Sequence, residues 1–145
     1  MHLIVDTNII ISGLITPNGT IADLIFNKLE KSILISPRFM FDELQDKSGK
    51  ILSITGFTED YLKELFYIIR KNVEFIDDKL ITFENQKRAY QLVHDIDKKD
   101  LLFIALSLQT GYKLWTGDKK LIKGLRKKGY KGLVSTVELI DLIES

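Results

Sequence analysis

Short runs of apolar residues recur along the chain, and each of them has the length of a β-strand. Five of these runs are rich in residues that favour β-structure. They lie at residues 3–5, 33–35, 73–76, 113–115 and 133–135. The pattern therefore predicts five strands spread over the whole chain.

Between these runs, apolar residues recur every three or four positions, which indicates amphipathic helices. Such groups are Ile21, Leu24, Ile25 and Leu29; Leu62, Leu65, Phe66 and Ile69; Leu101, Ile104, Ala105 and Leu108; and Val137, Ile140 and Leu142. Three of these groups are preceded by a residue that favours a helix start, namely Thr20, Thr58 and Asp97. Asp118 precedes the basic segment at 119–131 in the same way. Alternating strands and helices predict an α/β fold, in which a mostly parallel sheet carries helices on both faces in a Rossmann-like three-layer arrangement.

The 145 residues contain no repeat, no low-complexity tract and no Pro/Ser-rich linker, so we expect one domain spanning residues 1–145. No apolar run approaches the roughly 20 residues that cross a bilayer. The N-terminal segment has the pattern of a strand rather than of a signal peptide. We therefore expect no membrane association.

The absence of cysteine excludes disulfides and thiolate-bound zinc or iron–sulfur sites, and it agrees with a cytoplasmic location. The two histidines, His2 and His94, cannot form a site that needs three imidazoles. A bound metal would be held mainly by oxygen, which favours Mg²⁺, Mn²⁺ or Ca²⁺. We expect His94 to be a surface or packing residue rather than a catalytic base.

The net charge of +1 is unevenly distributed, because positions 119–131 hold seven basic residues and no acid. The other 14 basic residues face 20 acids. Such a basic block is either the solvated face of a helix or a surface that meets a phosphate backbone.

Two acids directly follow predicted strand ends. Asp6 follows the first strand, and Asp118 follows Thr116-Gly117 at the end of the fourth. In open parallel sheets, ligands gather outside the carboxyl ends of the strands. Each of these acids is also suited to cap the next helix, so either role is open when each is taken alone.

Three more acids lie at the start of a predicted helix or inside one. Asp97 is the expected cap of the helix that follows it, and Asp100 at the third position would complete a loose capping box. Their spacing puts both carboxylates on one face, which is unfavourable without a cation between them. Glu43 is expected about two turns into a helix whose first turn contains Pro37, which is too deep for a helix cap. Glu43 is therefore either a functional acid or a residue on a solvated helix face, and Asp42 is its neighbour.

Taken together, these segments resemble a PIN domain, a family of metal-dependent nucleases with a parallel sheet between helices. The motifs that carry the resemblance are Val5-Asp6-Thr7-Asn8, Glu43-Leu44, Asp97-x-x-Asp100 before Ile104-Ala105-Leu106, and Trp115-Thr116-Gly117-Asp118-Lys119-Lys120-Leu121. They follow one another over residues 3–142. The likeness is greatest to small bacterial and archaeal PIN proteins that serve as toxins of toxin–antitoxin pairs, the VapC-like group.

The resemblance implies a role for each matching residue. It makes Asp6, Glu43, Asp100 and Asp118 the catalytic acids and the ligands of Mg²⁺ or Mn²⁺. For Asp97 it leaves three roles open: an extra metal ligand, a residue that supports the ligands, or only a helix cap. It implies that Asn8 and Thr116 are polar residues that support the neighbouring acids. The first basic residues of the next helix, Lys119, Lys120 and Lys123, would contact nucleic acid.

The expected function is that of an endoribonuclease that cleaves RNA phosphodiesters with metal-activated water, acting as a toxin with an antitoxin protein as partner. Formation of a homodimer is left open. One alternative is a non-catalytic PIN-like domain that binds RNA or a protein. Another is a haloacid-dehalogenase-like phosphatase, which is disfavoured because Asn8 and Ile122 stand where that class has acids.

Overall fold

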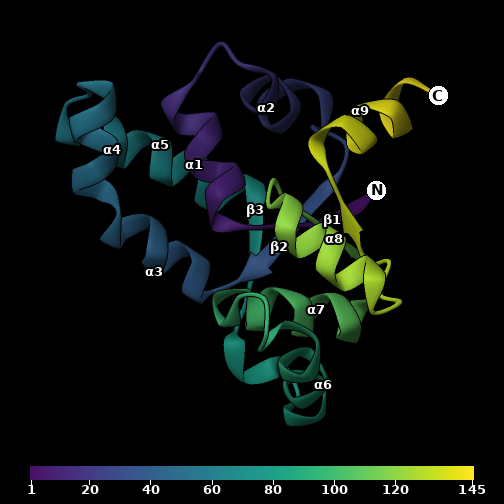
Figure 1. Cartoon of the computed structure of the whole chain (residues 1–145). Coiled ribbons are helices and arrows are strands. Elements are labelled where there is room, and N and C mark those ends of the chain that lie inside the picture. Colours follow the sequence, from purple (N-terminus) through teal and green to yellow (C-terminus); the bar gives the residue numbers. More distant parts are fainter.

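The computed structural model describes residues 1–145 and contains one five-stranded sheet in which every strand pair is parallel (Figure 1). The strands are β1 (His2–Val5), β2 (Ile33–Pro37), β3 (Val73–Ile76), β4 (Lys113–Trp115) and β5 (Leu133–Val134). Their order across the sheet is β3-β2-β1-β4-β5. The predicted fold class is therefore confirmed, and the predicted strands at 73–76 and 113–115 match the observed ones residue for residue.

Nine α-helices connect and cover the strands. They are α1 (Thr7–Ile15), α2 (Thr20–Asp23), α3 (Phe39–Asp46), α4 (Ser48–Thr55), α5 (Glu59–Asn72), α6 (Phe83–Val93), α7 (Leu101–Thr110), α8 (Lys119–Lys127) and α9 (Thr136–Glu144). A π-helical turn, η1 (Leu24–Lys28), extends α2, and two 3₁₀ turns, η2 (Asp78–Leu80) and η3 (Lys98–Asp100), precede α6 and α7.

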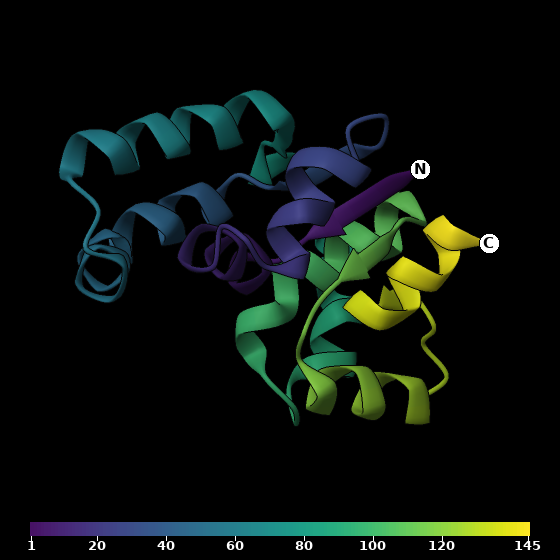
Figure 2. The ribbon, with the colours of Figure 1, turned by 90° about the horizontal axis from the view of Figure 1, so that it is seen from above.

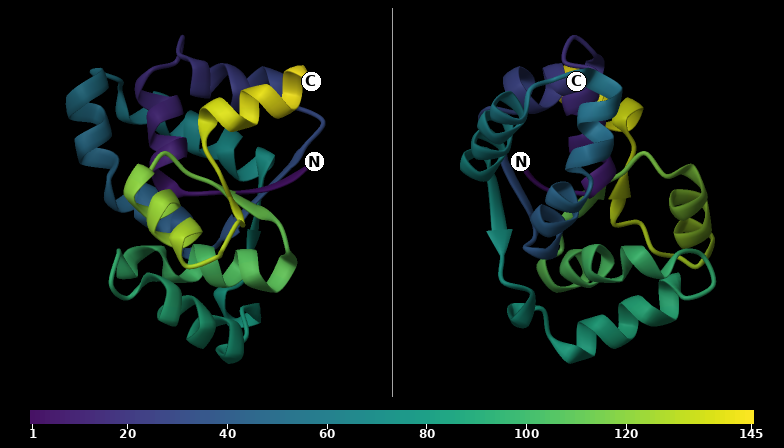
Figure 3. Two further views of the ribbon diagram at one scale, coloured as in Figure 1. Left: turned by 45° about the vertical axis from the view of Figure 1, so that its right-hand side comes forward. Right: turned by 90° about the vertical axis from the view of Figure 1, so that its left-hand side faces the viewer.

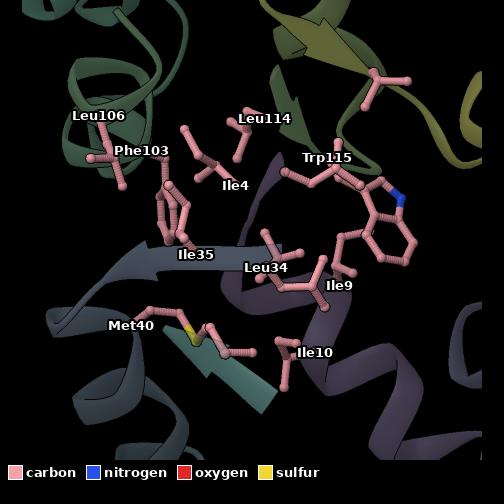
Figure 4. Packing of buried hydrophobic residues seen from close by; sticks show 14 of the residues in the cluster. Ile4, Ile9, Ile10, Leu34, Ile35, Met40, Phe103, Leu106, Leu114 and Trp115 are labelled. Carbon is pink, nitrogen blue, oxygen red and sulfur yellow. The ribbon is translucent and has the colours of Figure 1, made fainter. Parts of the chain in front are cut away.

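The helices form layers on both faces of the sheet. Helix α7 packs against β1, β2 and β4 with α6 outside it, while α1, α2, α5 and α9 lie on the other side (Figures 1 and 3). Successive strand residues point to opposite faces. Accordingly, Ile35 faces Phe103 of α7, and Leu34 faces Ile9 of α1 (Figure 4). Both faces of the sheet are thus buried in one continuous core.

Helices α4 and α5 form an arm that reaches to one side of the sheet, and α3 leads into it (Figure 2). The expected start of α3 was wrong, because Pro37 is the last residue of β2 and the helix begins at Phe39. Glu43 is consequently the fifth residue of α3, little more than one turn from its start.

Two other expectations need correction. Thr20 is the first residue of α2 and not its cap, since Gly19 takes the cap position without a side-chain hydrogen bond. In α9, Val137 and Leu142 are exposed, because the helix packs on the core through Leu139. No single helix is long and apolar enough to cross a membrane; α1 and the segment Thr20–Lys28 pass that test only as a pair, bent by 106°.

Candidate metal centre

The parallel register brings the ends of β1 and β4 together. Val5 pairs with Trp115, and the backbone N–H of Asp6 donates a 3.4 Å hydrogen bond to the Trp115 carbonyl. Asp6 directly follows β1, and Asp118 follows β4 after two residues. These two acids, which are 112 positions apart in the sequence, therefore stand at the same edge of the sheet.

A cleft of about 170 Å³ opens at this edge. The residues that line it are Asp6, Thr7, Asn8, Glu43, Lys47, Asp97, Lys99, Asp100, Phe103 and Asp118. They come from α1, α3, η3 and α7, from the cap residues Asp6, Lys47 and Asp97 that adjoin three of these elements, and from the loop between β4 and α8. The structure thus brings together all four acids expected as ligands, together with Asp97 and Asn8; we call this site the acidic cleft.

Three of the acids lie especially close to one another. Asp97, Asp100 and Asp118 each offer a carboxylate oxygen, and these oxygens all lie within 4.8 Å of one another. None of the three ion pairs of the protein involves an acid of the cleft. Carboxylate oxygens without a cationic partner are the donors that hard divalent ions prefer, so the residues present fit Mg²⁺ or Mn²⁺.

Two carboxyl groups of the cleft, those of Asp100 and Asp6, have raised pKa values. Burial, together with repulsion from Asp97, Asp6, Asp118 and Glu43, raises the pKa of Asp100 to about 7. Burial also raises the pKa of Asp6, whose residue is 6% exposed, although hydrogen bonds from Thr116, Ile9 and Asn8 oppose this. A cation in the cleft would remove the repulsion and favour the charged forms.

Three acids of the cleft also cap helical turns. Asp6 accepts from the Ile9 N–H at 2.9 Å, Asp97 from Lys99 at 3.0 Å, and Asp118 from Leu121 at 3.0 Å. The capping box expected for Asp100 was wrong, because its side chain forms no cap hydrogen bond. A partly buried carboxylate that faces other acids and caps nothing has no structural role that explains its charge.

The polar neighbours position these acids. The Thr7 hydroxyl donates a 2.8 Å hydrogen bond to Oε1 of Glu43. Thr116 is fully buried, and its hydroxyl accepts from the Asp118 N–H at 3.2 Å. Asn8 is exposed in the first turn of α1. Thr116 therefore lies behind the acids, whereas Asn8 faces the opening of the cleft.

Helix α8 begins at the cleft, since Asp118 is its N-cap. Its apolar side is buried through Leu121, Ile122 and Leu125. The residues expected to meet nucleic acid are exposed and unpaired, namely Lys119, Lys120 and Lys123. Farther along, Arg126 pairs with Glu138 and Lys128 pairs with Asp95.

His94 lies outside the cleft. It is exposed, its ring stacks on Tyr90, and its Nδ1 lies 3.0 Å from the Tyr90 carbonyl oxygen. The surface or packing role expected from the sequence agrees with this position.

Sequence reasoning missed four residues that line the cleft: Thr7, Lys47, Lys99 and Phe103. Thr7 adjoins Asp6, and Lys99 lies between Asp97 and Asp100, so their closeness in sequence to the predicted acids could have identified both. No sequence feature identified Lys47, because it reaches the cleft only through the position of α3, which it follows.

Comparison with known proteins identifies the matching family. The family model described as PIN domain matches residues 4–137. A chain in the crystal structure of VapBC2 from Rickettsia felis bound to a DNA fragment from their promoter has a similar fold, with a TM-score of 0.67 and 14% identity. The alignment covers 93% of this chain and 97% of that one. No match was found among curated proteins.

Proposed function

Because this chain belongs to the PIN-domain family, we propose that it is a divalent-metal-dependent endoribonuclease whose catalytic centre is the acidic cleft. One observation carries the proposal: five carboxylates from four segments of the chain line one small cleft and have no cationic partner. Residues 1–145 act together as a single nuclease domain.

In this proposal, Asp6, Glu43, Asp100 and Asp118 hold Mg²⁺ or Mn²⁺, and Asp97 completes the ligand set. The bound ion supplies positive charge against the phosphate and lowers the pKa of the attacking water. The Thr7 hydroxyl orients Glu43, while the Ile9 N–H and the Thr116 side chain orient Asp6.

The surroundings of the acids suit an RNA strand. Phe103 is the one apolar residue that lines the cleft. Helix α8 begins beside Asp118, and its first two turns carry Lys119, Lys120 and Lys123. These lysines form no ion pair and provide positive charge for the phosphates next to the scissile bond. Asn8, at the opening, binds a sugar or phosphate oxygen.

The proposed biological setting is a toxin–antitoxin pair. The neighbour from Rickettsia felis is described as VapBC2 bound to promoter DNA, and its fold matches this chain along nearly the full length of both. We therefore include an antitoxin protein as the partner that restrains the nuclease.

The test is cleavage of a labelled single-stranded RNA by the purified chain in Mg²⁺, in Mn²⁺ and in chelator. Asp6→Asn and Asp100→Asn remove ligands, and Asp46→Asn is the matched control because Asp46 is exposed on α3 and does not line the cleft. We expect cleavage with metal, none with chelator, and a loss in both ligand variants beyond the roughly 10–100-fold that a supporting residue costs.

Two results would contradict the proposal. Wild-type protein that binds RNA but cuts none in either metal would be a non-catalytic PIN domain. Cleavage that survives chelator would place the chemistry elsewhere. Single-stranded DNA of the same sequence, run in parallel, tests the preference for RNA.

A further inference from the structure

A second cavity, of about 380 Å³, shares helix α3 with the acidic cleft. It is lined by Arg38, Phe41, Asp42, Gln45, Arg70 and Phe75, and we call it the arginine cavity. Neither arginine forms an ion pair with a carboxylate. Two guanidinium groups without a carboxylate partner therefore lie beside two aromatic rings that pack against the core.

The arginine cavity includes Arg38 at the same edge of the sheet as the cleft, and it also includes Phe75 within β3 and Arg70 near the end of α5. Ile4 pairs with Ile35, so Asp6 is level with Pro37 at the ends of β1 and β2. Arg38 follows Pro37 directly. Helix α3 separates the two sites: it sends Glu43 into the acidic cleft, and Asp42 and Gln45 into the arginine cavity. A helix is about 10–12 Å across with its side chains, so the sites are near neighbours.

The aromatic residues hold one arginine in place. The Arg70 guanidinium lies over the Phe41 ring, 5.2 Å from its centroid. Phe41 in turn packs edge-on against Phe75 at 5.6 Å and Phe66 at 6.1 Å. A guanidinium fixed in this way presents a flat surface on which a base can stack. Asp42 and Gln45 supply an acceptor and an amide to hydrogen-bond the edge of such a base.

The charges of the two sites are complementary to one strand. The arginine cavity has two cations and one acid, while the acidic cleft has five acids and two lysines. A strand whose scissile phosphate is in the cleft needs a cationic surface for its next phosphates. Arg38, which follows β2 next to β1 in the sheet, offers that surface.

From this arrangement we propose that the arginine cavity binds an unpaired nucleobase of the RNA strand that is cut in the acidic cleft. The base stacks on Arg70, and Arg38 contacts the neighbouring phosphate. This inference rests on the proposed function, since it assigns a subsite to the same substrate. It means that the nuclease reads a single-stranded segment around its cut site.

The test is binding of a fluorescein-labelled single-stranded 12-nucleotide RNA, measured by anisotropy in chelator so that nothing is cut. The variants are Arg70→Gln, Arg70→Lys and Arg38→Gln. Arg88→Gln is the matched control, because Arg88 is an exposed, unpaired arginine on α6 outside the cavity. All three positions are exposed, and a thermal melt checks that each of the four variants is folded.

We expect Arg70→Gln to weaken binding at least about fivefold, the lower end for one stacked base, without changing the salt dependence. Arg70→Lys should not restore binding, because lysine keeps the charge but has no flat surface. Arg38→Gln should lower the slope of log affinity against log salt by about 0.7, as loss of one phosphate contact to a single strand does. Arg88→Gln should bind like the wild type.

Equal binding by Arg70→Gln, Arg38→Gln and the Arg88→Gln control would overturn the subsite while leaving the nuclease intact. Full rescue by Arg70→Lys would overturn base stacking. If the wild type neither binds nor cuts RNA, the proposed function itself fails and the subsite fails with it, so the two failures are distinguishable.

Discussion

The Thr7 hydroxyl donates a 2.8 Å hydrogen bond to Oε1 of Glu43, and this contact joins the start of α1 to α3 across 36 residues. Thr7 is buried, and Glu43 is partly buried at the wall of the acidic cleft. Glu43 has two acidic neighbours in the same helix, Asp42 and Asp46. The hydrogen bond therefore selects which acid of α3 faces the cleft.

Thr7→Val should reduce RNA cleavage, because it releases Glu43 while keeping the shape of the side chain. A hydrogen bond to a charged group contributes about 1.5–3 kcal/mol, which corresponds to roughly a 10–100-fold loss in kcat. Thr7→Ser retains the hydroxyl and should recover most of the rate. A loss of melting temperature in Thr7→Val with kcat unchanged would mean that the contact serves only the fold.

Addition of Mn²⁺ should stabilise the wild type and not Asp100→Asn, as measured by thermal unfolding from chelator to rising metal. A ligand at 100 times its dissociation constant adds about 2.7 kcal/mol to the stability of the native state. Asp100 forms no cap hydrogen bond, so the amide removes only a charge from the cleft. Asp46→Asn should respond like the wild type, and equal responses of all three proteins would exclude a metal site at Asp100.

Without metal, the wild type should lose stability as the pH rises from about 4 to about 8. The pKa of Asp100 is raised from 3.8 to about 7 by burial and by the neighbouring acids. The folded state therefore binds this proton more tightly than the unfolded state, and the stability it adds is present below about pH 4 and is lost as the pH passes about 7.

Urea unfolding of the wild type and of Asp100→Asn at pH 5 and pH 8 measures this effect. Partial exposure to solvent reduces it, so we expect the variant to gain about 1–2 kcal/mol relative to the wild type between the two values. Parallel pH profiles of the two proteins would contradict the raised pKa.

Replacement of Lys119, Lys120 and Lys123 together by glutamine should weaken RNA binding and make it less dependent on salt. Each phosphate contact to a single strand contributes about 0.7 to the slope of log affinity against log salt, so three contacts give about 2. Lys50→Gln, an exposed lysine on α4 outside the acidic cleft, should change neither quantity. An unchanged slope in the triple variant would assign the basic face of α8 to solvent.

Gly132→Ala should destabilise the fold next to β5. A Cβ there would lie 2.2 Å from the hydroxyl oxygen of Tyr130 and 2.4 Å from its Cζ. The Tyr130 ring would have to move, although its hydroxyl is bound to Ser107 at 2.5 Å. Overpacking of this kind costs typically 1–3 kcal/mol, and chemical unfolding should show it. Gly49→Ala, with open space around the added methyl group, is the control.

The sequence alone predicted the fold class, because strands buried on both faces read as apolar runs and the helices between them repeat every three to four residues. It also singled out the acids, since Asp6 directly follows β1 and Asp118 lies three positions after the end of β4. The sequence pattern did not predict helices α1, α4 and α6. α1 is apolar on most sides, so it has no clear amphipathic period, and α4 is short.

Caps and metal ligands could not be told apart from the sequence, because the same residue types serve both roles at helix starts. The structure shows that Asp6, Asp97 and Asp118 cap turns and still line the cleft, whereas Asp100 caps nothing.

The sequence by itself thus determined the alternation of elements and the local chemistry of each strand end, both of which depend on neighbouring residues. Only the tertiary structure decided which side chains meet. The pairing of β1 with β4 places Asp6 beside Asp118. The position of α3 directs the Glu43 side chain to the acidic cleft and the Asp42 side chain to the arginine cavity. Such choices depend on how distant elements pack, and local sequence pattern carries no record of that packing.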